Sequence, residues 1–205
     1  MEKMIFLIRH AEPLRIDDQK RYLGGQSDPD LSLAGREQAE RLAEALKAKQ
    51  LQTVFSSDLH RAEQTAAIVA AKSLCSHHMI DAFREINMGK WEGKSHQEIR
   101  EAYPDDYCRR GNDLANFQPP EGESLSDLQR RVLPAFLDVV KNTDGNLAIV
   151  AHAGVNRVIL CHLMALPLQQ LFIIEQNYAG VSLIRVSSGS YQILEINQRY
   201  DDPTS

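Results

Sequence analysis

Two histidines and two arginines stand at or just after the ends of short apolar runs, where they could act together on an anion. Arg9 and His10 follow one run. Arg61 lies shortly after a second run, and His152 directly follows a third. A neutral imidazole, with an unperturbed pKa of about 6.5, is a competent nucleophile at cellular pH. Guanidinium groups bind phosphate oxygens in bidentate fashion and stay charged. These residue types therefore indicate phosphoryl transfer through a covalent histidine.

Departure of an alcohol from phosphate needs a proton, and Glu85 is the candidate that supplies it. A carboxylic acid can protonate the leaving oxygen as the phosphoryl group transfers. Glu85 follows Phe83 and can reach the same site from that segment. The start of a helix expected near Gly154 adds backbone N–H donors for the anion, which makes Ala153 a candidate substrate contact.

The apolar runs before these residues have the pattern of strands buried on both faces, as in a parallel sheet. Because ligands in open α/β sheets bind beyond the carboxyl ends of the strands, the polar residues are expected to meet there. Strands alternating with helices predict an α/β fold with a mainly parallel sheet. Strands are expected at 4–8, 53–56 and 147–151, with helices at 32–49, 58–72 and 154–165.

The remaining segments carry weaker or irregular patterns. A helix is expected at 124–142, although Pro134 should kink or restart it. The stretch 104–122 has no period and several prolines, so a long loop or lid is expected, and loops this long are usually functional. The other expected elements are a weak strand at 79–83, a short helix at 95–103 and a terminal pair of strands at 180–186 and 191–196.

Four motifs, LIRHAEP, SSDLHRAEQTA, FREINMGKWEG and VAHAGV, occur in this order. Together they resemble the histidine phosphatase superfamily, the phosphoglycerate-mutase-like proteins. The resemblance implies a three-layer α/β/α sandwich, a phosphohistidine intermediate, and neither a metal nor a cofactor. It makes His10 the nucleophile and Glu85 the proton donor. It also implies that Arg9 and Arg61 bind phosphate and that His152 stabilises the transferring phosphoryl group.

The chain departs from the family pattern close to the first motif. The usual glycine after the histidine is Ala11, which is tolerable where the local φ is negative. Pro13 stands where a hydroxyl residue is common, and Ile16 where an asparagine contacts phosphate. Arg15 or Ser56 could replace these auxiliary contacts.

The segment GGQSDPDLS and the compact length resemble the smaller phosphatase members, such as α-ribazole phosphatase. In that comparison Gln26 corresponds to a residue of the substrate loop.

Competing phosphate motifs fail on spacing. GKWEGKS has three residues between its glycines where a nucleotide-binding loop requires four. Asp28 and Asp30 follow a turn-like segment instead of the strand that a magnesium-dependent phosphatase would need.

Composition limits the remaining classes of function. The length of 205 residues favours a single domain over 1–205. The net charge of -5 and the scattered basic residues argue against nucleic acid as a partner. Its longest apolar run, at 66–71, is far below the ~20 residues that a membrane span needs. Three widely separated cysteines indicate neither disulfides nor zinc. A cytoplasmic protein, monomeric or homodimeric, is expected.

The sequence therefore predicts a metal-independent phosphomonoester hydrolase that acts on a small phosphorylated metabolite. One alternative is phosphoglycerate-mutase-type transfer, in which the phosphoryl group returns to a second hydroxyl. Another is a non-catalytic protein that binds a phosphorylated ligand, which the substitutions at Ala11, Pro13 and Ile16 favour. The joint presence of the five core residues argues against this binding protein.

Overall fold

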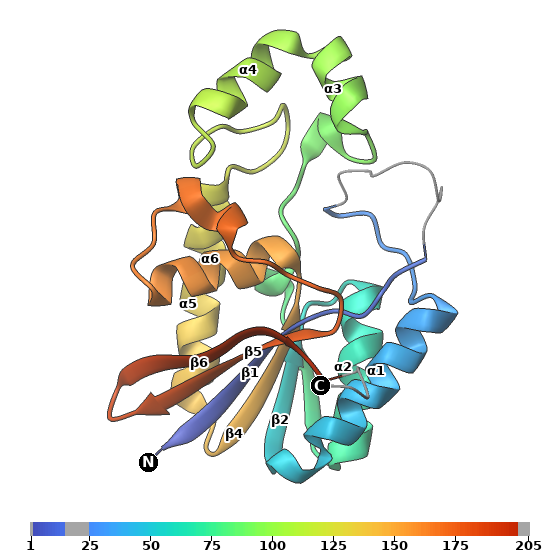
Figure 1. Ribbon diagram of the computed structural model, residues 1–205, viewed down its shortest axis with the longest axis vertical. Coiled ribbons are helices and arrows are strands. Elements are labelled where there is room, and N and C mark those ends of the chain that lie inside the picture. The colour runs from blue at the N-terminus through green and yellow to red at the C-terminus, as the bar shows by residue number, and fades with distance from the viewer. Residues whose placement is uncertain (1, 15–24, 201–205) are drawn as a thin grey trace.

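A six-stranded sheet with the order β3-β2-β4-β1-β5-β6 forms the centre of the computed structural model, which describes residues 2–14 and 25–200 (Figure 1). The first four of these strands run parallel to one another, and β5 and β6 are antiparallel at one edge. The expected α/β class with a mainly parallel sheet is confirmed. The strands are β1 (Lys3–Arg9), β2 (Leu51–Ser56), β3 (Ser76–Met79), β4 (Asn146–Ala151), β5 (Gly180–Ser187) and β6 (Ser190–Arg199).

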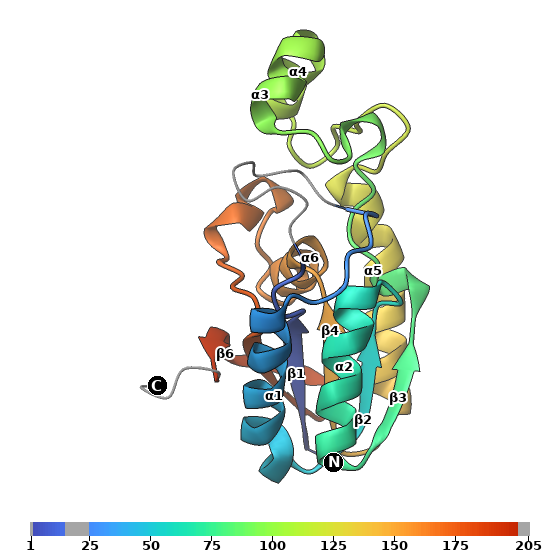
Figure 2. The same cartoon turned by 90° about the vertical axis from the view of Figure 1, so that its right-hand side faces the viewer.

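Helices cover both faces of the sheet, with α1 and α2 on one side and α5 and α6 on the other (Figures 1 and 2). Side chains of β1 alternate between these faces, as strand geometry requires. Phe6 and Ile8 pack in the core cluster with α1 and α2, whereas Ile5 and Leu7 pack with α5 and α6. The helices are α1 (Leu33–Leu46), α2 (His60–Ser73), α3 (His96–Ala102), α4 (Pro104–Asn112), α5 (Leu125–Asn142) and α6 (Ala153–Leu163).

Serine caps fix where several of these helices begin. Ser32 accepts a hydrogen bond from the Gly35 amide at the start of α1. Ser124 and Asp127 form a capping box that starts α5, within the helix expected at 124–142. Pro134 lies inside α5, which continues through it as one helix and does not restart. Proline removes a single N–H donor, and burial of the helix face, which continues past it to Phe136, compensates for that loss.

Two expectations were wrong. The strand expected at 79–83 lies earlier, at Ser76–Met79, and a 3₁₀ turn, η2 (Asp81–Phe83), follows it. The stretch 104–122 is not a loop throughout, because its first nine residues form α4. Pro104 occupies the first turn, where its missing N–H costs nothing, and acidic residues follow it while Arg109 and Arg110 occupy the last turn.

Helices α3 and α4 stand apart from the sandwich, beyond the carboxyl ends of the parallel strands (Figures 1 and 2). We call residues 88–122 the cap. The cap has a small apolar core of its own, in which Trp91 stacks on Phe117 with ring centroids 5.2 Å apart and Met88 and Ile99 pack beside them. The cap is therefore a packed unit placed over one end of the sheet.

The last two strands form a hairpin that matches the expected terminal pair. Ser188 and Gly189 connect them, both at positive φ, the conformation that two-residue hairpin turns favour. Across the described residues, no helix has the length and apolar character that crossing a membrane would require.

Candidate active site

Parallel pairing of β1 with β4 brings the two histidines of the sequence motifs together. Arg9 stands opposite Ala151 in the register, so His10 and His152 leave adjacent strand ends. The backbone N–H of His10 donates to the Ala151 carbonyl at 2.9 Å. The two imidazole centroids lie 5.1 Å apart. The expected convergence of these side chains at the carboxyl ends of the strands is thus what the structure shows.

The ring of His10 has one nitrogen fixed and one available. Its Nδ1 donates to the Ala11 carbonyl oxygen at 2.8 Å, since a carbonyl can only accept. The proton therefore resides on Nδ1, and Nε2 keeps its lone pair. Burial lowers the pKa of His10 well below its ordinary value, and the charges of Arg61 and Arg9 lower it further. His10 is consequently neutral at cellular pH.

Ala11 replaces the family's usual glycine, and its φ is not positive, as an alanine there requires. The residue therefore accommodates its methyl group without strain. Its side chain is buried and its amide donates to Thr65 Oγ1 at 3.1 Å. Pro13 forms an isolated β-bridge with Leu31. Positions 15 and 16 lie outside the described residues, so the structure does not test the contact expected from Arg15.

His152 is fully buried, yet neither of its ring nitrogens has a hydrogen-bond partner within the described chain. It is the N-cap of α6, in an extended backbone conformation, and its side chain makes no capping hydrogen bond. Burial is the main cause that lowers its pKa well below the ordinary value, and electrostatic repulsion from His10, Arg61 and Arg9 lowers it further. Buried polar atoms are nearly always paired, so this ring is suited to a ligand that is bound between it and His10.

Arg9 is held in place by contacts on two sides. Its Nη1 donates to the Gln176 carbonyl at 2.7 Å, and its guanidinium carbon lies 3.9 Å from the centre of the Tyr178 ring. Its Nε is buried and has no partner among the described residues. A fixed, partly unsatisfied guanidinium beside His10 is a group that binds anions.

Arg61 is oriented by the loop at 25–27. Its Nη1 donates to the Ser27 carbonyl at 2.6 Å and its Nη2 to the Gly25 carbonyl at 3.0 Å. Glu92 Oε1 accepts hydrogen bonds from the amides of the same loop, Gly25 at 2.7 Å and Ser27 at 2.9 Å. The loop is thus clamped between a cation and an anion. Sequence reasoning missed Glu92, although it lies in the third motif.

Gln26 occupies the middle of this clamped loop. Its Nε2 donates to the backbone carbonyl of Glu85 at 2.6 Å, so the amide links the loop to the segment that carries Glu85. Ser56, in contrast, is fully buried and bonds His77 Nε2 at 2.8 Å on the β3 side. The structure therefore brings Gln26 to the site and directs Ser56 to a neighbouring strand.

The Glu85 carboxylate is buried and accepts two backbone hydrogen bonds. Its Oε1 accepts from the Ile86 amide at 2.9 Å and its Oε2 from the Gly154 amide in the first turn of α6 at 3.0 Å. A Cβ at position 154 would lie 2.4 Å from Oε1. Only glycine at this position allows the carboxylate to lie where it does.

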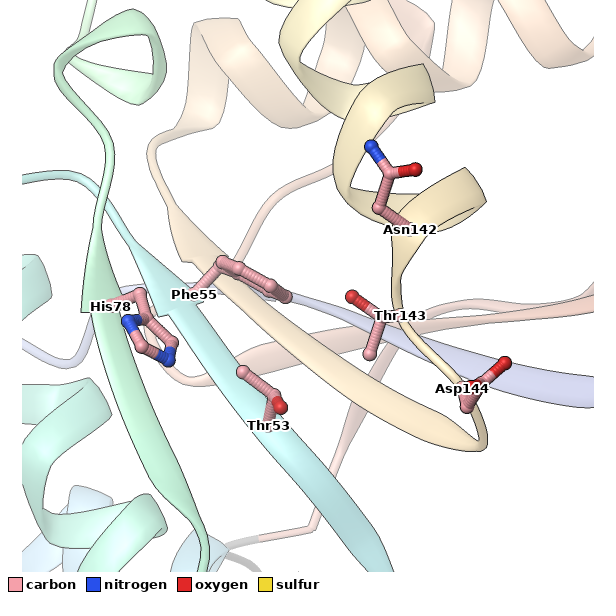
Figure 3. A pocket seen from close by; sticks show the side chains of 6 residues that line it. All are labelled: Thr53, Phe55, His78, Asn142, Thr143 and Asp144. Carbon is pink, nitrogen blue, oxygen red and sulfur yellow. The ribbon is translucent and has the colours of Figure 1, made fainter.

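A pocket of about 260 Å³ opens beside Arg9 and Glu85 and extends beneath the cap. Ala153, the first residue of α6, lines it together with apolar side chains of the cap. A second hollow, drawn in Figure 3, lies between β2, β3 and the end of α5, where Thr143 and Asp144 precede β4. That hollow includes His78 and is at the amino end of β4, whereas His10 and His152 lie at the carboxyl ends of the strands.

Comparison with known proteins agrees with this geometry. The model of the histidine phosphatase superfamily (branch 1) matches residues 5–199. Phosphoserine phosphatase 1 of Hydrogenobacter thermophilus is 32% identical over 199 residues, covering 96% of this chain and 92% of that protein. The adenosylcobalamin/alpha-ribazole phosphatase of Escherichia coli is 26% identical over 198 residues, covering 96% and 91%.

Solved structures share the arrangement of the whole chain. The structure of Bacillus stearothermophilus YhfR superimposes with a TM-score of 0.86 at 29% identity, covering 98% of this chain and 100% of that one. The family match extends beyond the four motifs and includes the cap and the terminal hairpin. The chain therefore belongs to the histidine phosphatase superfamily, branch 1, and is a phosphatase.

Proposed function

We propose that this protein hydrolyses phosphomonoesters of small metabolites in two steps through a phosphohistidine at His10. One observation carries the proposal. The His10 ring has its proton fixed on Nδ1 by the Ala11 carbonyl, which leaves Nε2 unprotonated in a site that also holds Arg9, Arg61 and His152. Nucleophile and anion-binding groups are thus in position before a substrate arrives.

In the first step, His10 Nε2 attacks phosphorus, an N–P bond forms and the ester P–O bond breaks. Glu85 gives a proton to the departing alcohol oxygen. Arg9 and Arg61 hold the phosphoryl oxygens. Arg61 retains N–H groups for this purpose, because a guanidinium has five and two are used by the loop at 25–27. His152 donates one N–H to the transferring group, where charge develops.

In the second step, the Glu85 carboxylate accepts a proton from water, whose oxygen attacks phosphorus as the N–P bond breaks. Inorganic phosphate leaves, His10 recovers its lone pair and Glu85 is protonated again. The positive charge that both steps need is supplied by Arg9 and Arg61, so activity is expected to survive excess chelator.

The discriminating experiment is a panel of phosphomonoesters that includes phosphoserine, α-ribazole phosphate and phosphoglycerates, run with chelator. Inorganic phosphate and isomerised product are both measured. We expect one phosphate released per alcohol formed. Isomerisation without phosphate release would establish a mutase, and binding without either product would establish a binding protein. Activity that requires added magnesium would contradict the metal-independent mechanism.

We also propose a cytoplasmic location and a small phosphorylated metabolite as the principal partner. The location is supported by three unpaired cysteines, Cys75, Cys108 and Cys161, because thiols persist in reducing compartments. Whether the chain is a monomer or a homodimer stays a prediction, which sedimentation of the purified protein would test.

Gly154→Ala is expected to lower kcat on alkyl phosphates by about 10²-fold with little net change in stability. The new methyl group would meet Glu85 Oε1 at 2.4 Å, so the carboxylate, at the far end of a flexible side chain, has to move. Misplacement of a reacting group by about 1 Å can cost about 10²-fold. Alanine itself is favoured over glycine inside a helix by about 1 kcal/mol. Steady-state kinetics and thermal unfolding together measure both effects.

Gly111→Ala is the matched control, because Gly111 is also helical and a Cβ there would meet nothing within 4 Å. This variant should keep wild-type kinetics. Wild-type kcat in Gly154→Ala would show that the position of the Glu85 carboxylate does not limit the reaction.

A further inference from the structure

The pocket beside Arg9 and Glu85 lies where the alcohol part of a phosphate ester would extend. It begins at the two residues that flank the phosphoryl position and continues between the sandwich and the cap. Figure 1 shows α4 above the dark orange segment η4 (Leu168–Ile173), and residues of both line the pocket. At about 260 Å³, the pocket is slightly smaller than the roughly 300–1,000 Å³ typical of small-molecule sites, which suits a small metabolite.

One part of the pocket wall is apolar. Phe117 and Leu125 are each 8% exposed and Leu171 is 1% exposed, so these side chains are held in packed positions. Phe172 lines the same space but is 54% exposed, which leaves its ring available to a ligand. A wall of this kind favours an apolar or aromatic body on the substrate.

Two cations in the pocket are outside the salt bridges that the described residues form. Arg110 from α4 and Arg157 from α6 both line it, and neither forms a salt bridge within residues 2–14 and 25–200. Their guanidinium carbons lie 6.0 Å and 5.3 Å from the centre of the same Phe172 ring. Arg157 is oriented by a hydrogen bond from its Nε to the Ile174 carbonyl at 2.9 Å, and its terminal nitrogens make no hydrogen bond to the residues that the structure describes.

The acidic groups of the pocket are already engaged elsewhere. Glu85 accepts two backbone amides, and Glu123 accepts hydrogen bonds from Arg131 Nε at 3.0 Å and Nη2 at 2.9 Å. Burial lowers the pKa of both Arg110 and Arg157, which reflects the cost of holding a charge away from water; Arg9 lowers the pKa of Arg157 further, and Glu85 offsets only part of that shift. An anionic ligand would remove that cost.

We propose that this pocket binds the alcohol part of the substrate, and that this part carries an apolar or aromatic body and a second anionic group that Arg110 and Arg157 bind. The inference rests on the proposed phosphatase function and narrows its substrate class. The second anion is a carboxylate or a further phosphate, since guanidinium groups bind both in the same fashion. It gives the segment 104–122 a specificity role, because Arg110 and Phe117 both come from it.

Three synthetic substrates test the proposal: benzyl phosphate, its para-carboxylate and its para-phosphonate. They share an aromatic body and a primary alkyl leaving group and differ in the second anion. We expect the wild-type protein to favour an anionic member over benzyl phosphate by at least about tenfold in kcat/KM, mainly through KM. The better of the two anionic members identifies the preferred anion.

Arg110→Gln and Arg157→Gln should each sharply lower that preference, because each removes one of the two guanidinium groups that bind the second anion and the loss in kcat/KM falls mainly on the anionic substrates. Arg157→Lys keeps the charge but loses the Ile174 contact, so retained preference in this variant separates charge recognition from a structural role. Arg130→Gln is the matched charge control, because Arg130 is exposed and pairs with Asp127 outside the pocket. It should behave as wild type.

The outcomes separate this inference from the function on which it rests. Hydrolysis of benzyl phosphate with no preference for either anionic analogue would overturn the inference and leave the phosphatase function intact. Preference that persists in both glutamine variants would also overturn it. Release of phosphate from none of the three substrates, nor from the broader panel, would overturn the proposed function itself.

Discussion

His10→Ala is expected to abolish phosphate release, with a loss of roughly 10⁴- to 10⁶-fold, the scale found when a covalent nucleophile is removed. The N–P bond is made by this side chain, and the described residues around it offer no thiol or activated hydroxyl in its place. Covalent labelling should disappear as well. Incubation with ³²P-labelled substrate, followed by an alkaline denaturing quench that preserves phosphohistidine, measures the label directly.

A second variant keeps this test independent of folding. His10→Asn retains an N–H group that can donate to the Ala11 carbonyl, as the imidazole does. It should unfold near the wild-type temperature and still show no label. His78→Ala, at an exposed histidine of β3, is the matched control and should label normally. A label that persists in both His10 variants would assign the nucleophile to another side chain.

Glu85→Gln is expected to lower turnover of alkyl phosphates by about 10²- to 10⁴-fold, while p-nitrophenyl phosphate loses much less. An alkoxide is a poor leaving group and depends on protonation, whereas p-nitrophenolate departs without it. Glutamine can still accept one of the two amide hydrogen bonds that hold the carboxylate, so the segment should remain in place. Comparison of kcat/KM on the two substrates is the measurement.

Burst kinetics establish whether phosphoryl transfer to His10 limits the rate, which the comparison requires. Glu121→Gln, an exposed residue paired with Lys90, is the matched control and should leave both substrates unaffected. With the first step limiting, an equal loss on the two substrates would assign Glu85 to positioning and leave the proton donor to be found.

The parts of the fold that could be predicted are those whose signal is local. Continuous apolar runs marked β1 and β4 because strands buried on both faces need apolar residues at every position. The position of the short strand β3 could not be predicted, because its residues, Ser76–Met79, are mostly exposed at the edge of the sheet and carry no apolar pattern. Helix α4 has no clear signal in the sequence, because prolines usually interrupt helices and only the first turn, where Pro104 stands, tolerates one.

The residues of the candidate site also fall into two groups, those that a local sequence signal reveals and those that it does not. Residues that directly follow strands could be found, since parallel pairing alone brings His10 and His152 together. The roles of Glu92 and Gly154 could not, because each depends on contacts between segments distant in sequence. Glu92 binds amides at Gly25 and Ser27, and Gly154 matters only because Glu85 packs against it. Periodicity carries no information about such approaches.

The clamp around the loop at 25–27 has a consequence for how a ligand is received. Arg61 and Glu92 hold this loop through four hydrogen bonds to its backbone. The conformational entropy of ordering that backbone, about 1–2 kcal/mol per residue, is therefore lost when the chain folds and not when a phosphate binds. A ligand meets a guanidinium whose orientation is already set, so more of the contact energy remains as affinity. The stability of the fold and the strength of phosphate binding are thereby linked through one arginine.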